Sequence, residues 1–250
     1  MNSSIMVAGL GKRYRHSHAN KPLTLQEAVV AGWRNMKPQI NTWALRDVTF
    51  TAMPGETLGV IGKNGAGKST LIKTLGGVLK ADEGMIKVNG RVCALLDPGG
   101  SFHRDLTGLE NARIGGVMSG LSRAEASRSL ESIIEFAELE SAVDSPIRAY
   151  STGMKMRLSF SIAVHSKPQI LLIDEVLAVG DLSFQAKCLE RIAQLKSDGC
   201  TLVFVSHNME HIEHYSDRVL YLSQGKVVIQ GNPTDVRTVY ESDAYADALT

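Results

Sequence analysis

Residues 62–69 carry the pattern with the clearest chemical meaning in the chain. They read Gly-Lys-Asn-Gly-Ala-Gly-Lys-Ser and fit the P-loop pattern in full, between an apolar run and an expected helix. Glycines let successive backbone N–H groups point at a phosphate, and a helix N-terminus favours negative charge. Lys68 would place its charge between the β- and γ-phosphates of a nucleoside triphosphate, and the Ser69 hydroxyl would bind Mg²⁺.

An ordinary glycine-rich turn is the alternative interpretation of this segment. It would explain the bend of the chain, but not a Lys-Ser pair at the required offset from the glycines. We therefore expect a phosphate-binding loop. Its candidate nucleotide-binding residues are Gly62, Lys63, Asn64, Gly65, Ala66, Gly67, Lys68, Ser69 and Thr70.

Two acidic residues directly follow a second apolar run. Residues 170–173 (Ile-Leu-Leu-Ile) predict a buried strand, and Asp174 and Glu175 come next. Acids at the end of a buried strand are costly unless they serve a cation or a reaction. Beside a P-loop, Asp174 is expected to hold Mg²⁺ through water, and Glu175 to act as the general base on the attacking water. A strand that simply ends in a polar loop is the plainer alternative.

The surrounding pattern predicts an α/β core that a helical block interrupts. Strands are expected at residues 5–10, 44–52, 57–61, 170–173 and 201–205, and a closing hairpin turns at Gln224-Gly225. Residues 106–166 are expected to be mostly helical, with a capping box from Ser122 to Glu125. Asn89-Gly90, between two apolar runs, predicts a hairpin turn.

Residues 15–42 form an atypical stretch between the first two expected strands. Thr24 and Glu27 have capping-box spacing, apolar residues recur at helical spacing, and Pro38 ends the segment. We expect an inserted amphipathic helix over residues 25–36. It could serve a partner surface or shield the nucleotide site, or it could pack on its own domain.

The bulk composition excludes several classes of protein. Lys and Arg total 27 against 26 Asp and Glu, which gives no sign of a nucleic-acid binder. The three cysteines have neither metal-ligand spacing nor a disulfide framework, which fits a reducing compartment. No apolar run approaches the roughly 18 residues needed to span a bilayer. The N-terminus does not resemble a signal peptide, so we expect the protein to stay in the cytoplasm.

The motifs together resemble ABC-type ATPases over essentially the whole chain. In detail they are similar to the ATPase subunits of ABC exporters of bacterial surface polysaccharides, the O-antigen, capsule and teichoic-acid type. The segments that carry this resemblance are residues 43–48 (WALRDV), 94–97 (ALLD), 102–108 (FHRDLTG) with Glu110 and Asn111, 150–154 (YSTGM) and 174–181 (DEVLAVGD).

The resemblance implies a P-loop NTPase fold: an ABC ATPase core with an antiparallel β subdomain and a helical signature subdomain, one domain over residues 1–240 with a C-terminal tail at 241–250. It also implies further site residues. Ser151 and Gly153 match the signature that contacts the γ-phosphate, although Ser151 could be a plain helix N-cap. Asp181 matches the D-loop and His207 the switch histidine. Tyr14 matches an aromatic that stacks on adenine.

One departure concerns the glutamine that most ABC ATPases use to sense Mg²⁺ and water. The chain has no glutamine there; Asp97 supplies the acid usual in the polysaccharide-exporter subfamily, and Pro98 stands where leucine is usual. Proline should stiffen this loop.

The resemblance further implies ATP and Mg²⁺ as ligands and a homodimer with ATP at its interface. Two such subunits would dock under a separate integral membrane permease, at the cytoplasmic face of the membrane, without nucleic acid. The expected function is ATP hydrolysis that powers polysaccharide export. Two alternatives remain: an ABC motor for another cargo, such as a lipid or small molecule, and a soluble ABC ATPase that acts on ribosomes or DNA.

Overall fold

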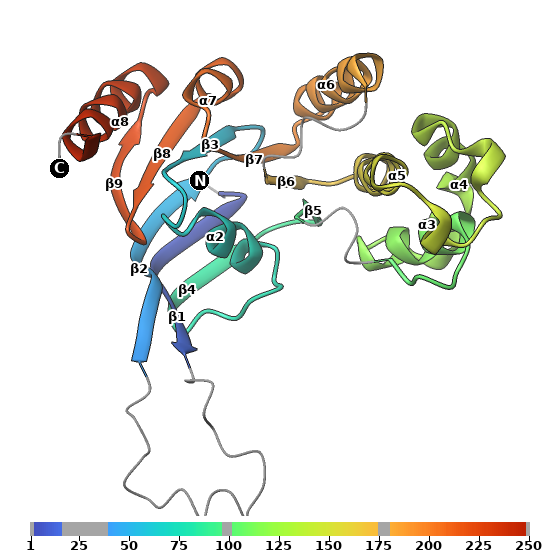
Figure 1. Cartoon of the computed structure of the whole chain (residues 1–250), viewed down its shortest axis with the longest axis horizontal. Coiled ribbons are helices and arrows are strands. Elements are labelled where there is room, and N and C mark those ends of the chain that lie inside the picture. The colour runs from blue at the N-terminus through green and yellow to red at the C-terminus, as the bar shows by residue number, and fades with distance from the viewer. Residues whose placement is uncertain (1–2, 17–39, 97–101, 175–180, 249–250) are drawn as a thin grey trace, which may run out of the picture.

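The computed structural model describes residues 3–16, 40–96, 102–174 and 181–248 of the chain. Within these ranges a larger and a smaller sheet meet a group of helices at one side (Figure 1). The larger sheet has the strand order β5-β6-β7-β3-β8-β9, and the smaller has the order β2-β1-β4. The strands of the larger sheet are β3 (Thr57–Ile61), β5 (Val92–Leu95), β6 (Ile170–Asp174), β7 (Thr201–Ser206), β8 (Arg218–Ser223) and β9 (Lys226–Gly231).

The larger sheet is parallel apart from β9 and carries apolar side chains on both faces. Along β6, Ile170 and Leu172 pack into the core beneath helix α2 (Lys68–Leu75), while Leu171 and Ile173 pack into the core on the opposite face. Covered on both faces, such strands are continuous apolar runs. The predicted strands at 57–61, 170–173 and 201–205 are therefore confirmed, as is the hairpin at Gln224-Gly225.

The smaller sheet is antiparallel and contains the longest strands of the described chain. β1 (Ile5–His16) and β2 (Ile40–Ala52) pair from Ile5↔Ala52 to His16↔Ile40, and β4 (Glu83–Val88) pairs with β1 on its other side. Both strands run beyond the expected bounds, so the ends of the 15–42 stretch belong to this hairpin. The helix expected over residues 25–36 lies outside the described residues.

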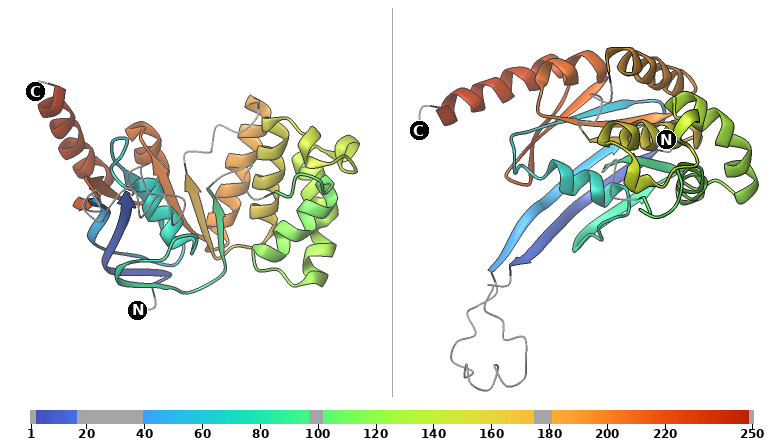
Figure 2. Two further views of the ribbon diagram at one scale, coloured as in Figure 1. Left: turned by 60° about the horizontal axis from the view of Figure 1, so that its bottom comes forward. Right: turned by 45° about the vertical axis from the view of Figure 1, so that its right-hand side comes forward.

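The helical block expected over residues 106–166 is confirmed. It consists of α3 (Gly108–Met118), α4 (Arg123–Ala137) and α5 (Thr152–His165), with short turns at Glu140–Ala142 and Ile147–Ala149. Capping boxes start α3 at Thr107 and α4 at the predicted Ser122. These helices share their own apolar core, away from the smaller sheet (Figure 2). They form the helical subdomain.

The remaining helices are α6 (Leu182–Ser197), α7 (Met209–Tyr215) and α8 (Pro233–Ala248). The sequence pattern does not predict α8, and residues 241–248 of the expected tail belong to it. Its Val236 is fully buried, and its Tyr240 meets Tyr221 of β8 edge-on with ring centroids 5.3 Å apart. The end of α8 lies on the opposite side of the molecule from the helical subdomain (Figures 1 and 2).

The prediction of a hairpin turn at Asn89-Gly90 is wrong. β4 pairs with β1, whereas β5 pairs with β6 in the other sheet. Instead of turning back, the chain crosses between sheets. Asn89 is fixed at this crossing by two hydrogen bonds of 2.8 Å. Its backbone N–H donates to the carbonyl oxygen of Ser4, and its side-chain amide donates to that of Ser3.

Candidate functional site

Three neighbouring parallel strands end at one edge of the larger sheet, and the candidate residues follow them. The P-loop follows β3, Asp174 is the last residue of β6, and His207 directly follows β7. β7 lies between the other two, with Val205 opposite Asp174 and Ser206 opposite Ile61. The carboxyl edge of a parallel sheet is where ligands bind in such folds. Strand order thus brings together residues more than a hundred positions apart.

The P-loop holds its shape through left-handed glycines and close packing. Gly65 has φ +81° and Gly67 has φ +107°, which side chains with a Cβ rarely adopt. A Cβ on Gly67 would also lie 2.5 Å from the carbonyl oxygen of Ala44, on β2. At the other side, the Ala66 carbonyl oxygen accepts a 2.9 Å hydrogen bond from the N–H of Gly225. The loop is therefore fixed between β2 and the β8–β9 turn.

Helix α2 starts at Lys68, so the loop presents a helix N-terminus to the cavity. Gly67 occupies the N-cap position, and no side chain caps the first amides. These N–H groups have no partner within the helix, which makes such an end suited to a phosphate. The buried Lys68 ammonium donates hydrogen bonds to the carbonyl oxygens of Gly62 at 2.6 Å and Lys63 at 3.1 Å. Its charge is thus held inside the curl of the loop.

A cavity of about 370 Å³ opens above this loop. Its lining combines backbone amides, hydroxyls, a lysine and a carboxylate, which suits a triphosphate with its bound cation. Among the described residues no cluster of three or more His, Cys, Asp or Glu could hold a metal. A hydroxyl and one carboxylate fit Mg²⁺, which keeps waters and phosphate oxygens as its other ligands. The lining residues are Ala44, Asn64, Gly65, Gly67, Lys68, Ser69, Thr70 and Asp174.

Tyr14 does not line the cavity but belongs to β1, whose partner strand β2 contributes Ala44 to the lining. It pairs with Thr42, and the preceding pair is Arg13 with Trp43. The register shifts between the Lys12–Leu45 and Arg13–Trp43 pairs, so the pairing skips Ala44. Ala44 lines the cavity, and Tyr14 is 38% exposed. This placement is compatible with an aromatic that stacks on a base.

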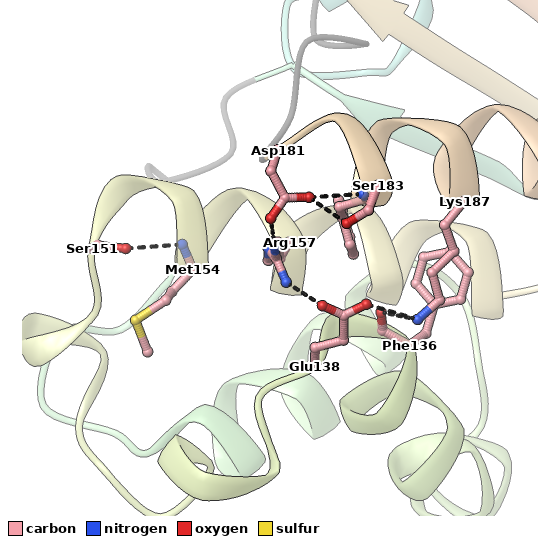
Figure 3. A network of polar contacts seen from close by, with 9 residues as sticks. Phe136, Glu138, Ser151, Met154, Arg157, Asp181, Ser183 and Lys187 are labelled. Carbon is pink, nitrogen blue, oxygen red and sulfur yellow. Dashed lines mark hydrogen bonds and ion pairs between the residues drawn. The ribbon is translucent and has the colours of Figure 1, made fainter.

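Ser151 and Gly153 lie at the N-terminus of α5 in the helical subdomain, where Figure 3 shows Ser151. The Ser151 hydroxyl accepts a hydrogen bond of 3.2 Å from the N–H of Met154, so it does cap the helix. Its side chain is nevertheless exposed. Neither residue is part of the cavity lining. Within one subunit the structure does not bring the signature and the P-loop together.

The remaining candidates flank the carboxyl edge of the sheet. His207 is exposed. Asp181 is the N-cap of α6, where its Oδ1 accepts a 2.9 Å hydrogen bond from the N–H of Phe184. Glu175, Asp97 and Pro98 lie outside the described residues.

The fold and the loop geometry define an ATPase of the P-loop class. A family profile described as ABC transporter matches residues 45–178, just over half of the chain. The chain therefore belongs to the ABC transporter family and is an ABC ATPase, a class that binds ATP. This assignment confirms the predicted fold.

Relatives with known roles support this membership. An O-antigen export system ATP-binding protein of Klebsiella pneumoniae is 44% identical over 198 residues, which cover 79% of this chain and 80% of that protein. A teichoic acids export ATP-binding protein of Lactococcus lactis is 41% identical over 207 residues, which cover 83% of this chain and 44% of that protein. A solved ATP-binding subunit of an ABC transporter superposes with a TM-score of 0.76 and 25% identity, covering 99% of this chain and 100% of that one.

Two residues of this region were not predicted from the sequence. Ala44 lines the cavity because β2 passes beside the P-loop, and its small apolar side chain gives no chemical signal. Arg157, close after the signature, binds Asp181. A basic residue on a helix is ordinarily a solvated surface group, so only the three-dimensional packing reveals its partner.

Proposed function

We propose that this chain hydrolyses ATP to power export of a surface polysaccharide through a separate membrane subunit. The cavity at the P-loop carries the ATPase component of this proposal, because its lining supplies what a triphosphate and Mg²⁺ require. The cargo rests on relatives: the Klebsiella pneumoniae and Lactococcus lactis proteins are named for O-antigen and teichoic-acid export, and both cargoes are cell-surface polymers.

Each site residue has a proposed role in this reaction. Lys68 and the amides of residues 62–70 hold the phosphates, and Ser69 with Asp174 hold Mg²⁺, which neutralises charge on the phosphate oxygens. Glu175 accepts the proton of the attacking water, and His207 contacts the γ-phosphate from the neighbouring strand. Tyr14 stacks on the adenine.

A complete site requires a second subunit. Ser151 is exposed and Gly153 is half-buried at the start of α5, and neither lines the cavity of its own chain. We propose that in a homodimer they contact the ATP on the partner's P-loop, as donors at a helix N-terminus. ATP would then close the dimer, and hydrolysis would release it. This two-state cycle is what a membrane subunit could respond to.

In the described part of the chain, none of the helices has both the length and the apolar character of a membrane span. We propose that two copies dock on a dimeric membrane permease at the cytoplasmic face of the inner membrane. The permease would provide the path for the glycan, and these subunits would provide the ATP-driven motion.

Deleting the gene tests the cargo. The proposal predicts loss of one surface polysaccharide and accumulation of its lipid-linked form inside the cell, restored by the wild-type gene and not by Glu175→Gln. If every surface glycan is unchanged and efflux of a lipid or small molecule is blocked instead, the polysaccharide assignment is wrong and the general ABC motor remains. Co-purification with a membrane protein distinguishes both from a soluble ATPase that acts on ribosomes or DNA.

A further inference from the structure

A network of charged side chains joins three helices beside the signature serine (Figure 3). Arg157, in the second turn of α5, extends its guanidinium between two carboxylates. Its Nη1 donates to Oε2 of Glu138 at 2.6 Å, and its Nη2 donates to Oδ2 of Asp181 at 2.9 Å. Glu138 ends α4 and Asp181 starts α6. One side chain thus ties α5 to both neighbouring helices.

The arginine is held firmly in this position. Its side chain is 18% exposed, and the guanidinium carbon lies 4.6 Å from the ring centroid of Phe184. A guanidinium is suited to this place because its planar fork can donate to two carboxylates at once. The Lys187 ammonium donates to Oε1 of Glu138, the carboxylate oxygen that Arg157 does not bind, at 3.3 Å. It also donates to the carbonyl oxygen of Phe136 at 3.0 Å.

The backbone of Glu138 is an independent sign that its carboxylate matters. Glu138 has φ 57° and ψ 47°, the left-handed conformation that glycine and asparagine tolerate best. Either residue would relieve this strain, and either would remove the carboxylate that holds Arg157. Strained residues of this kind are concentrated where a side chain has a task beyond packing.

We infer that Arg157 is a positioning residue of the two-subunit active site. Through its ion pairs with Glu138 and Asp181, it holds the start of α5 and the start of α6 in one arrangement. This inference rests on the proposed function. Ser151, at the start of α5, contacts the ATP that is bound to the partner subunit. Asp174, which precedes α6 in the chain, belongs to the site for the ATP that is bound to its own subunit. Arg157 therefore connects the two nucleotide positions within one chain.

Three substitutions break this link in different ways. Arg157→Gln removes the shared cation. Asp181→Asn removes the charge that faces Arg157, but it keeps the α6 cap because an asparagine Oδ1 also accepts the backbone hydrogen bond. Glu138→Asn removes the other carboxylate and suits the left-handed backbone.

Arg148→Gln is the matched control. It breaks an ion pair of 2.6 Å with Asp105 in the same subdomain, where both side chains are largely exposed. This pair does not involve α5 or α6, so its loss leaves the proposed link intact.

The experiment places each variant in the Glu175→Gln background, which is expected to bind ATP without hydrolysing it. Binding of ATP is measured at low protein concentration, ATP-driven dimerisation by sedimentation velocity, and the melting temperature by calorimetry. The three link variants should bind ATP within about twofold of the background, yet show a dimer dissociation constant raised about tenfold or more. Glu138→Asn should keep or raise the melting temperature. The control should match the background throughout.

Link variants that dimerise as well as the background would overturn the inference alone. A Glu138→Asn variant that loses melting temperature and dimerisation together would also overturn it, since the network would then be merely structural. If the background itself binds ATP and stays monomeric, the proposed two-subunit site is overturned, and the inference with it.

Discussion

The ammonium of Lys68 donates a hydrogen bond of 2.6 Å to the carbonyl oxygen of Gly62, the first residue of the same loop. Lysine and loop therefore support each other's geometry through contacts within the chain. Pre-organisation of this kind lowers the cost of ordering the site when a ligand binds.

Lys68→Ala should lower ATP affinity about tenfold or more, because a charge-assisted contact with the β- and γ-phosphates is lost from a partly desolvated site. Lys73→Ala, in the last turn of the same helix, is the control and should bind normally. Equilibrium titration with a fluorescent ATP analogue measures both. Equal affinities for the two variants would remove Lys68 from the phosphate site.

Glu175→Gln should reduce turnover by about 10²–10⁴-fold while ATP binding persists, because an amide of the same shape does not accept the proton of water. Steady-state phosphate release and ATP binding are measured side by side. Turnover near the wild-type rate would exclude Glu175 as the general base.

Gly67→Ala should lower both stability and ATP affinity. Its φ of +107° costs an L-residue about 1–2 kcal/mol, and the added Cβ would lie 2.5 Å from the Ala44 carbonyl oxygen. Gly77→Ala is the control, with φ +74° and nothing within 4 Å of the new Cβ. Thermal melts and ATP titrations should show that the control loses only stability. A control that loses ATP affinity equally would refute this account of the loop.

Acid should destabilise the helical subdomain through its capping boxes. The pKa of Glu125 is lowered by hydrogen bonds from the Ser122 side chain and backbone, and the Thr107 backbone and hydroxyl lower the pKa of Glu110. With folded pKa values below the unfolded value of 4.5, these carboxylates contribute stability above that pH. The contribution is lost as pH falls through the folded pKa.

Glu125→Gln should make the unfolding free energy less dependent on pH below 4.5, because glutamine can keep the cap hydrogen bond but binds no proton there. Urea unfolding at a series of acidic pH values measures this dependence. An unchanged slope would mean that the box carboxylate is not protonated in the transition.

Local patterns in the sequence are sufficient to predict the P-loop, the buried strands and the helix cap at Ser122, because each of these features depends on residues that are neighbours along the chain. Asn89-Gly90 was misread for a related reason. Turn residues between apolar runs indicate a change of direction, but the pairing partner of each strand is set by distant residues such as those of β1 and β6.

The features of the site that depend on tertiary contacts could not be predicted from the sequence. Ala44 lines the cavity because β2 packs beside Gly67, and Arg157 gains its partners because α4 and α6 pack against α5. The separation of Ser151 from its own P-loop cavity is likewise a matter of how the helical subdomain is placed.

A disulfide cross-link between subunits can report on the shared site, because the native thiols are poor competitors. Burial raises the pKa of Cys93 to about 11, and those of Cys188 and Cys200 to about 12, and all three are buried. Few thiolates form at neutral pH, so a new exposed pair should oxidise selectively.

The central claim, that two subunits build one ATP site, is tested most directly by cross-linking Asn64→Cys to Ser151→Cys in the Glu175→Gln background. Asn64 lines the cavity, and Ser151 would meet the same nucleotide from the partner. The account predicts that mild oxidation, after mixing the two variants with one added cysteine each, gives a species of twice the 27.1 kDa chain mass with ATP and not without it. Normal ATP binding with no ATP-dependent cross-link would contradict the account.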